Sequence, residues 1–258
     1  MSTPDNDIPA PPEKDPTTEW QTRGANPFTV YTRLDCAPVG MEEDLPQSTI
    51  EALTRAEEYA VEQAFWTGVT TGADTATVYP HLAALEEYVD SSGVLMQPAA
   101  TIITETPLEA TDALGAIERA LGDCYPGGGM IHVPAGLAAR FGADSLVTAR
   151  AGIQHTTLGN KVVFGRGYDG SGPDGSDDPG VSWIYATSDV FYQRSELEDH
   201  NFTEIFDRES NTIRALVERT YVVAWDCCLL AVPVIDAGDV EEVLWRVVYR
   251  RCARICCV

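Results

Sequence analysis

Eight prolines stand among the first 46 residues, and they restrict this part of the chain more than any other feature of the sequence. They occupy positions 4, 9, 11, 12, 16, 27, 38 and 46. Proline lacks a backbone N–H and disfavours helix at the residue before it, so a long helix is excluded there. The apolar residues, Ile8 and the run 28–31, are too sparse to form a core. We therefore predict that residues 1–45 form an extended arm, either disordered or ordered by lying on another surface.

A long helix is predicted directly after the arm. Apolar residues recur at spacings of three and four from Ile50 to Phe65, and Ser48 or Thr49 can cap the first turn. Gly68 is a residue that commonly ends a helix. With about 20 residues at 1.5 Å per residue, this helix has a length of roughly 30 Å.

The middle of the chain has the pattern of an α/β layer. Pro107 can open a second helix, which must stop before the turn at 125–129. Residues 130–133 are typical of a short buried strand, and Pro134 can open another helix that continues to about Phe141. The order helix, glycine turn, strand, helix indicates a sheet covered by helices.

The other segments carry weaker patterns. We expect a Gly/Thr-rich connection over 68–77, a short helix over 81–89, a strand within 94–103, a strand over 161–164 and a loop over 165–181. Beyond the loop the pattern is mostly β, with one or two strands over 181–191, a strand or short helix over 211–219, and an apolar run over 221–235. That run alternates little, so its strand is predicted to be buried on both faces.

The charge of the chain excludes one class of function. There are 40 Asp and Glu residues against 17 Lys and Arg, which gives a formal net charge of −23. A general nucleic-acid binder uses a dense basic surface to displace counterions from phosphates. We therefore expect a protein that can lie beside nucleic acid without gripping it. A hydrophobic content of 44% is that of a folded protein rather than a disordered acidic polymer.

Segments that direct a protein to a membrane are not predicted. No stretch reaches the roughly 18 to 20 consecutive apolar residues of a bilayer span. The first residues carry neither the basic nor the apolar region of a signal peptide. We expect a protein that is made and kept in a cytoplasm, with no membrane partner.

Cysteine and histidine form no recognised catalytic or metal motif. The cysteines stand at 36, 124, 227, 228, 252, 256 and 257. We predict reduced thiols that act as small hydrophobic residues rather than a disulfide framework. A metal site on Cys252, Cys256 and Cys257 is an alternative without a fourth ligand nearby. Cys124 with His132 or His155 forms a nucleophile and base pair only if the fold brings them together.

Two loops were weighed as ligand sites. The turn 126–129 precedes a strand and is not followed by Gly-Lys-Ser/Thr, so we predict a tight connection rather than a phosphate loop. Asp169, Asp174, Asp177 and Asp178 offer oxygen ligands for calcium, but their spacing lacks the EF-hand pattern and its closing Glu. We favour a solvated loop, and no cofactor or metal is predicted.

Four segments together carry a resemblance to a known family. They are ALTRAEEYAVEQAFWTG (52–68), LEATDALGAIERALGDCYPGGGMIHVPAGLAARFG (108–142), LGNKVVFGRGYDG (158–170) and RALVERTYVVAWDCCLLAVPV (214–234). Their order resembles the major capsid proteins of tailed viruses (bacteriophages), whose fold, the Johnson fold, is shared with encapsulin shells. The resemblance implies an α+β fold with an N-terminal arm, an extended loop, a peripheral domain with a spine helix plus long strands, and an α/β axial domain.

The resemblance also implies a division of the chain. The N-terminal arm takes 1–45, the peripheral domain 46–67 and 182–235, the extended loop 68–104, the axial domain 105–181 and the C-terminal tail 236–258. The arginine- and cysteine-rich tail has no counterpart in the family that we can place.

The function implied by the resemblance is structural rather than enzymatic. A major capsid protein self-assembles into pentamers and hexamers of an icosahedral shell that encloses double-stranded DNA. Scaffold, portal or decoration proteins are the implied partners, and the implied location is the virion, assembled in the host cytoplasm. An encapsulin-like compartment is the alternative with the same fold. A cytoplasmic α/β enzyme with a site around Cys124 and His132 is the alternative of another class.

Contacts between subunits are expected from large aromatic and cationic side chains of the arm and the long helix. The candidates are Trp20, Phe28, Tyr31, Arg33, Arg55 and Trp66. For each aromatic residue the alternative is the core of its own chain, and for each arginine it is a solvated surface charge.

Overall fold

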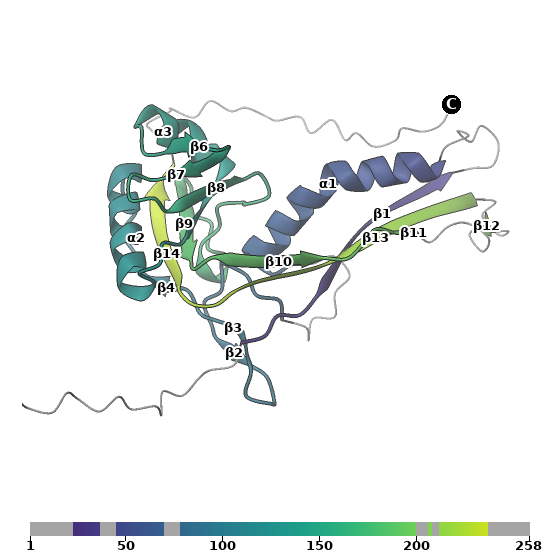
Figure 1. The fold of residues 1–258 in the computed structure, drawn as a ribbon, viewed down its shortest axis with the longest axis horizontal. Helices are drawn as coiled ribbons and strands as arrows, with labels where there is room; N and C mark the ends of the chain where they lie inside the picture. Colours follow the sequence, from purple (N-terminus) through teal and green to yellow (C-terminus); the bar gives the residue numbers. More distant parts are fainter. Residues whose placement is uncertain (1–22, 37–44, 70–77, 200–205, 208–211, 237–258) are drawn as a thin grey trace, which may run out of the picture.

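Two large β-sheets, each with a helix on one face, form most of the described part of the protein in this computed structural model (Figure 1). The structure describes residues 23–36, 45–69, 78–199, 206–207 and 212–236. The chain crosses between the two sheets in short connections, at 188–189 and at 226–228. This mixture of helices with largely antiparallel sheets agrees with the predicted α+β class.

The first sheet has seven strands in the order β4-β14-β9-β5-β8-β7-β6. Their bounds are β4 (Thr101–Ile102), β5 (Met130–Pro134), β6 (Thr148–Arg150), β7 (Ile153–His155), β8 (Lys161–Gly165), β9 (Val181–Thr187) and β14 (Leu229–Ile235). Helix α2 (Ala110–Cys124) packs on β14 and β9, and the short helices η1 (Ala135–Leu137) and α3 (Ala138–Ala143) follow β5. Leu114, Ile117 and Leu121 of α2 share a core with Ile131 and Val232 of the sheet.

The second sheet is built around the long strand β13 (Thr212–Trp225). On one side β1 (Phe28–Cys36) pairs with it antiparallel over nine residues, from Phe28 opposite Tyr221 to Cys36 opposite Ile213. On the other side lie β10 (Val190–Arg194), β11 (Glu198–Asp199) and β12 (Phe206–Asp207). Helix α1 (Leu45–Thr67) covers one face by packing on β1 and β13.

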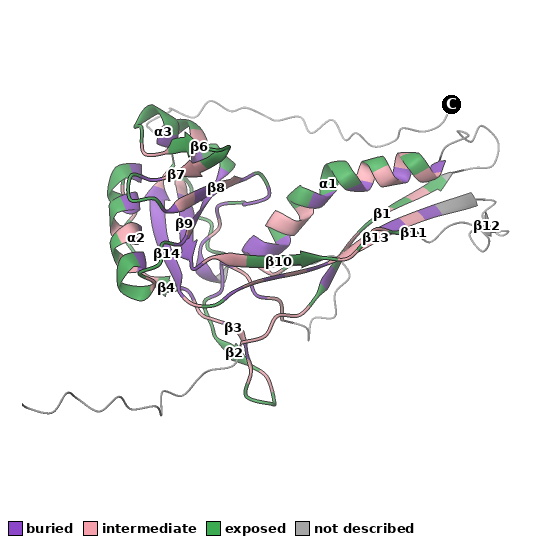
Figure 2. Ribbon diagram, in the orientation of Figure 1, coloured by how far each residue is buried: buried purple, intermediate pink, exposed green. Residues whose placement is uncertain are grey.

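The C-terminal end of α1 lies where the two sheets meet. Phe65 and Trp66 belong to a core that also contains Tyr185 of β9 and Tyr221 of β13. In Figure 2 burial is concentrated in β9, β14 and this end of α1, whereas most of β10 is exposed. Gly68 ends the helix with a φ of 70° and donates its N–H to the Ala64 carbonyl at 2.8 Å. The predicted end of the helix is therefore confirmed.

The sheet pairing does not follow the division that the resemblance implies between residues 181 and 182. That division groups β9 and β14 with the long helix, whereas both pair within the sheet that contains β5 and β8. The apolar run 221–235 is not one strand, because β13 ends at Trp225 and β14 begins at Leu229 in the other sheet. A purely apolar run gives no signal for the point at which a chain changes sheets.

Part of the predicted arm is a component of the subunit's own sheet. Strand β1 lies within the range 1–45, and its backbone is paired with β13 throughout. Residues 1–22 and 37–44 lie outside the described residues. For 28–36 the surface that orders the segment is therefore in the same chain, and for residues 1–22 the arm stays a prediction.

The short helix predicted over 81–89 is wrong. The N–H groups of Leu82 and Ala83 donate to the carbonyls of Phe65 and Trp66, each at 2.9 Å, and so satisfy the last turn of α1. The side chain of Gln97 bonds both the N–H and the carbonyl of His81. Residues 82–86 form turns and bends instead, and Tyr88 and Val89 pair with the segment 95–97.

The other elements of this region are short. They are β2 (Tyr88–Val89) and β3 (Leu95–Gln97), which form a two-stranded sheet, and η2 (Pro173–Gly175) in the loop before β9. Strands β3 and β4 together replace the strand predicted within 94–103. Among the described helices, none combines the length and the apolar character that a bilayer crossing needs.

Candidate functional site

One face of the five-stranded sheet has no helix over it in the described structure. Along β1 the even-numbered side chains, such as Phe28, turn toward α1, and the odd-numbered ones, such as Tyr31, turn away. Tyr31 is 50% exposed, and Phe191 of β10, which lies opposite Ala224, is 56% exposed. The hydroxyl groups of Thr29 on β1 and Thr220 on β13 form a hydrogen bond of 3.3 Å between these two neighbouring strands. We call this surface, formed by the outward residues of β1, β13 and β10, the open sheet face.

The six predicted contact residues divide into three groups. Phe28 and Trp66 are buried in the core of their own subunit, with 7% and 0% exposure, so they are not available to a neighbour. Tyr31, Arg33 and Arg55 are at the surface. Trp20 lies outside the described residues.

The two surface arginines are paired with acids of the same element. Arg33 contacts Asp35 through Nη2 at 2.8 Å, and Arg55 contacts Glu51, one helical turn earlier, also at 2.8 Å. Both pairs are substantially exposed, so each contributes little to stability. Their charges remain accessible at the surface.

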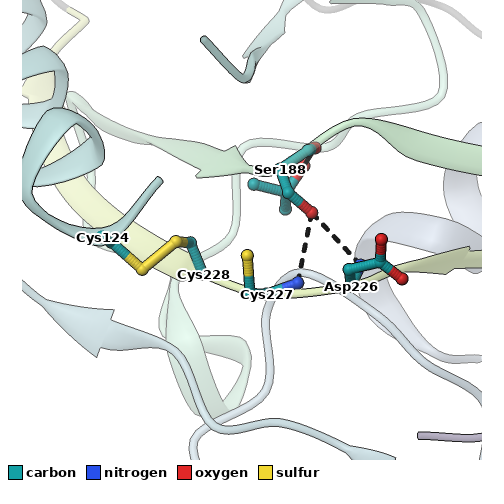
Figure 3. The surroundings of a disulfide bond; sticks show 6 residues. Cys124, Ser188, Asp226, Cys227 and Cys228 are labelled. Carbon is teal, nitrogen blue, oxygen red and sulfur yellow. Dashed lines mark hydrogen bonds between the residues drawn. A yellow bond between two sulfur atoms is a disulfide. The ribbon is translucent and has the colours of Figure 1, made fainter. Parts of the chain in front are cut away.

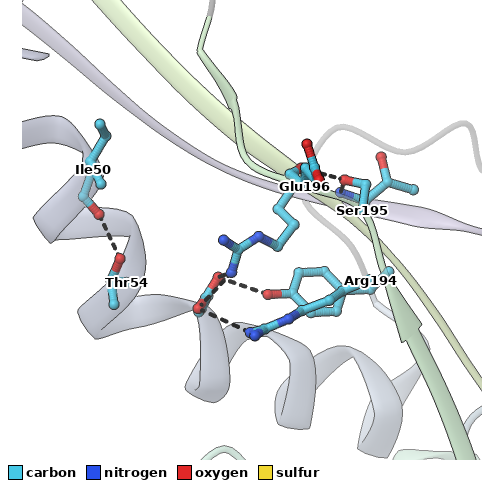
Figure 4. A network of polar contacts seen from close by, with 9 residues as sticks. Ile50, Thr54, Arg194, Ser195 and Glu196 are labelled. Carbon is cyan, nitrogen blue, oxygen red and sulfur yellow. Dashed lines mark hydrogen bonds and ion pairs between the residues drawn. The ribbon is translucent and has the colours of Figure 1, made fainter.

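A buried polar network joins α1 to the five-stranded sheet, and its members were not predicted. Glu57 of α1 is 8% exposed and accepts from both Arg219 Nη1, at 2.8 and 3.0 Å, and the Tyr221 hydroxyl, at 2.7 Å. Arg194 of β10 lies 4.0 Å from the same carboxylate (Figure 4). Burial raises the pKa of Tyr221, and its bond to Glu57 acts in the same direction. The sequence carries a signal for a buried charge here, because Glu57 lies four residues after Leu53 and so falls on the apolar face of the helix.

The alternative of a nucleophile and base pair at Cys124 with His132 or His155 is not assembled in the structure. The sulfur of Cys124 is bonded to that of Cys228 in a disulfide, which also corrects the prediction of reduced thiols for these two residues. His132 is 1% exposed, and its ring nitrogens lie 3.0 Å from Thr187 Oγ1 and 3.3 Å from the Tyr168 hydroxyl. His155 is held at 3.1 Å from the carbonyl of Ile153. None of these three residues offers a free nucleophile or base in a cleft.

His132 predicts a dependence of stability on pH. Burial lowers its pKa from 6.5 to about 3, so the folded protein keeps the ring neutral while the unfolded chain takes up a proton below pH 6.5. Stability is therefore complete above pH 6.5 and falls progressively toward pH 3. His81, whose pKa burial also lowers, acts in the same direction.

We expect His132 to account for ~2 kcal/mol of the loss of unfolding free energy between pH 7.5 and pH 5. Urea denaturation of His132→Gln at the two pH values measures this, because the variant lacks the titrating ring. The control is His155→Gln, which removes a partly exposed histidine and is expected to keep the wild-type difference. Equal pH differences in wild type and His132→Gln contradict the prediction.

The two possible ligand loops, the turn 126–129 and the loop with Asp169, are accounted for differently in the structure. A Cβ added at Gly129 would lie 2.3 Å from the Thr187 carbonyl oxygen, so the turn 126–129 brings two backbone segments close together, and its prediction as a tight connection is confirmed. Asp169 accepts from the N–H and the hydroxyl of Ser171. Among the described residues no cluster of metal-ligating side chains is found, and the side chain of Asp174 and Cys252, Cys256 and Cys257 lie outside them.

Comparison with known proteins identifies the fold. No protein-family model and no curated protein matches the sequence. The SrpI encapsulin complex of Synechococcus elongatus PCC 7942 aligns with a TM-score of 0.51 and 10% identity, over 84% of this chain and 77% of that chain. A chain of Gordonia phage Cozz aligns at 0.48 with 13% identity, over 83% and 71%. The capsid of an empty GTA particle aligns at 0.47 with 10% identity, over 80% and 72%.

Of these three alignments, the one with encapsulin reaches a TM-score of 0.5 and carries the assignment. It spans both sheets, because 84% of the chain cannot be covered by either sheet alone. At 10% identity the likeness is one of fold. The chain therefore has the capsid fold of encapsulins, the Johnson fold that its resemblance to tailed-virus major capsid proteins predicts.

Proposed function

We propose that this chain is the major capsid protein of a tailed double-stranded DNA virus and that it assembles into the pentamers and hexamers of an icosahedral shell. The observation that carries the proposal is the encapsulin fold over most of both chains. The sequence resemblance points to the same class of shell. Scaffold, portal and decoration proteins are the partners that such a shell requires.

In this proposal the two sheets correspond to the two domains of a capsid subunit. The seven-stranded sheet with α2 is the axial domain, and the five-stranded sheet with α1 is the peripheral domain. The extended loop is the region of β2 and β3, which projects away from both sheets in Figure 1. This proposed assignment differs from the division that the resemblance implies, because it places β9 and β14 with the seven-stranded sheet in which they pair.

The charge of the chain favours a shell around DNA. A wall with a net charge of −23 per subunit repels phosphate and does not adsorb the packaged molecule. An encapsulin-like compartment is the second candidate, and the TM-score with SrpI favours it. The two are separated by the content of purified particles, which is nuclease-protected DNA in the first case and a protein cargo in the second.

Electron microscopy of the purified full-length chain tests the proposal. We expect closed shells of uniform diameter in negative stain and a corresponding high-mass species in light scattering. Monomers or small oligomers in every assembly condition, with a folded circular dichroism spectrum, count against a shell protein.

The open sheet face is the contact surface that we propose for assembly, and Tyr31 on β1 and Phe191 on β10 are its large exposed aromatic residues. Arg33 on the same strand, Arg55 on α1 and Trp20 before β1 are the other proposed contacts with neighbouring subunits. Large aromatic side chains at half exposure are the type that interfaces bury. We expect the double variant Tyr31→Ser, Phe191→Ser to stay folded and to lose most particles.

The control for that variant is Tyr59→Ser, which removes an equally large side chain, 53% exposed, from α1. It is expected to assemble like the wild type. Particle yield is measured by sedimentation, and circular dichroism verifies folding. Full particle yield from the double variant contradicts the assignment of the open sheet face.

A further inference from the structure

The chain changes from one sheet to the other at two points that lie side by side. Between β9 and β10 it passes through Ser188, and between β13 and β14 it passes through Asp226 and Cys227. The Ser188 hydroxyl oxygen accepts from the N–H groups of Asp226, at 3.1 Å, and Cys227, at 3.2 Å (Figure 3). The Ser188 N–H donates to the Cys227 carbonyl at 3.0 Å. We call these two crossings the sheet junction, defined by residues 188–189 and 226–228.

A disulfide ties the sheet junction to helix α2. Cys228 is the last residue of the junction, and Cys124 is the last residue of α2. Their Cα atoms are 6.0 Å apart, in the range usual for disulfides, and 104 residues separate them in the sequence. Because α2 packs on β14 and β9, the bond holds the junction against the seven-stranded sheet.

The backbone at Cys228 is held in an unfavourable conformation. Its φ is 59°, in the left-handed region that residues other than glycine rarely adopt. Such a conformation persists where the surrounding contacts impose it. At Cys228 these contacts include the disulfide and the neighbouring atoms that bury the residue, which is 8% exposed. Without the covalent bond, the junction has one fewer restraint on this conformation.

The two cysteine residues differ in exposure to solvent. Cys124 is exposed at the end of α2, whereas Cys228 is buried. A small thiolate can therefore attack the Cys124 sulfur, which breaks the disulfide and releases Cys228 as a thiolate that takes up a proton. A second small thiolate then attacks the mixed disulfide, releases Cys124 and leaves as the oxidised small disulfide. Two electrons pass to the protein, and the reverse sequence with oxidised glutathione restores the bond.

We propose that Cys124 and Cys228 form a reversible redox clamp on the sheet junction, closed by disulfides such as oxidised glutathione and opened by small thiols. In the closed state the junction is fixed on α2. In the open state both sheets remain folded, and the amide hydrogens of Ser188, Asp226 and Cys227 exchange with solvent more readily. In a shell subunit the clamp would set how firmly the two sheets hold their relative orientation, and this last consequence alone rests on the proposed function.

Hydrogen exchange of the purified full-length subunit in glutathione buffers tests the clamp. Peptide mapping without reductant is expected to find the Cys124–Cys228 bond in oxidised glutathione and free thiols in reduced glutathione. On reduction, the amides of Ser188, Asp226 and Cys227 are expected to exchange about tenfold faster, whereas those of β5 and β8 change less than about twofold.

Two variants make the result specific. Cys124→Ser removes the exposed partner and is expected to exchange like the reduced wild type in both buffers. Cys227→Ser changes the neighbouring free cysteine, keeps the disulfide and is expected to respond to glutathione like the wild type. The proposal is overturned if both cysteines stay free in oxidised glutathione, if junction exchange is the same in both buffers, or if Cys227→Ser abolishes the response.

The consequence for a shell has a separate readout. If particles form, we expect oxidised wild-type particles to survive heating to a higher temperature than reduced ones, with no such difference for Cys124→Ser. Equal heat resistance in both buffers overturns this consequence. Failure to form any particle contradicts the proposed function, while the exchange experiment on the subunit still decides whether the clamp exists.

Discussion

Glu57→Gln is expected to lower the free energy of unfolding by about 3–5 kcal/mol. The carboxylate is the counter-charge of Arg219, whose side chain is 16% exposed, and glutamine leaves that guanidinium buried without an opposite charge. The Tyr221 hydroxyl also loses its anionic acceptor. Urea denaturation at pH 7 measures the change.

The control for this variant is Glu51→Gln, on the same helix. It breaks the pair with Arg55, whose side chain is 77% exposed, and is expected to change the free energy of unfolding by less than about 0.5 kcal/mol. A double variant, Glu57→Gln with Arg219→Gln, is expected to be more stable than the sum of the two single changes predicts, because it removes the unpaired charge. Equal losses for Glu57→Gln and Glu51→Gln contradict a buried network.

Trp66→Ala is expected to destabilise the subunit by a similar amount, about 3–5 kcal/mol. The indole is fully buried, with its ring centroid 4.8 Å from those of both Tyr168 and Tyr185. Its Nε1–H donates to the Ser171 carbonyl at 3.1 Å, so the truncation leaves a cavity and also removes a hydrogen bond. Thermal and urea denaturation of the unassembled subunit measure the loss.

Two comparisons show whether the loss comes from packing within the subunit. Trp66→Phe retains an aromatic ring and is expected to lose about half as much, while Tyr59→Ala at the surface is expected to lose less than about 0.5 kcal/mol. A Trp66→Ala subunit with wild-type stability that fails only in assembly would show that the indole serves a contact between subunits instead.

The elements that could be predicted from the sequence are those whose signals are local. The long helix ends at Gly68 as predicted, because apolar spacing and a residue that tolerates positive φ both act within a few residues. The strand at Met130–Pro134 and the helical turns after it are also confirmed. Pro134 is the last residue of the strand and directly precedes the helical turns. Its influence is local, because the ring of proline fixes its own φ and removes its own N–H.

The candidate contact residues were harder to place, because exposure depends on the partner strand. Phe28 and Tyr31 both belong to β1, and their residue types are equally suited to a core or an interface. Pairing of β1 with β13 turns Phe28 toward α1 and Tyr31 to the open sheet face. Phe191 had no alternating neighbours to mark it as exposed, so its position emerged only from the pairing with β13.

Local patterns in the sequence were enough to predict the long helix, the second helix and the strand at 130–134, and the net charge of −23 argued against a nucleic-acid-gripping surface. These depend on composition and on contacts between residues a few positions apart. Which strands share a sheet, where the chain crosses at 226–228, and the meeting of Cys124 with Cys228 become visible in the folded chain. These pairings join residues as far apart as Thr29 and Thr220, which are 191 positions apart, so no local pattern marks them.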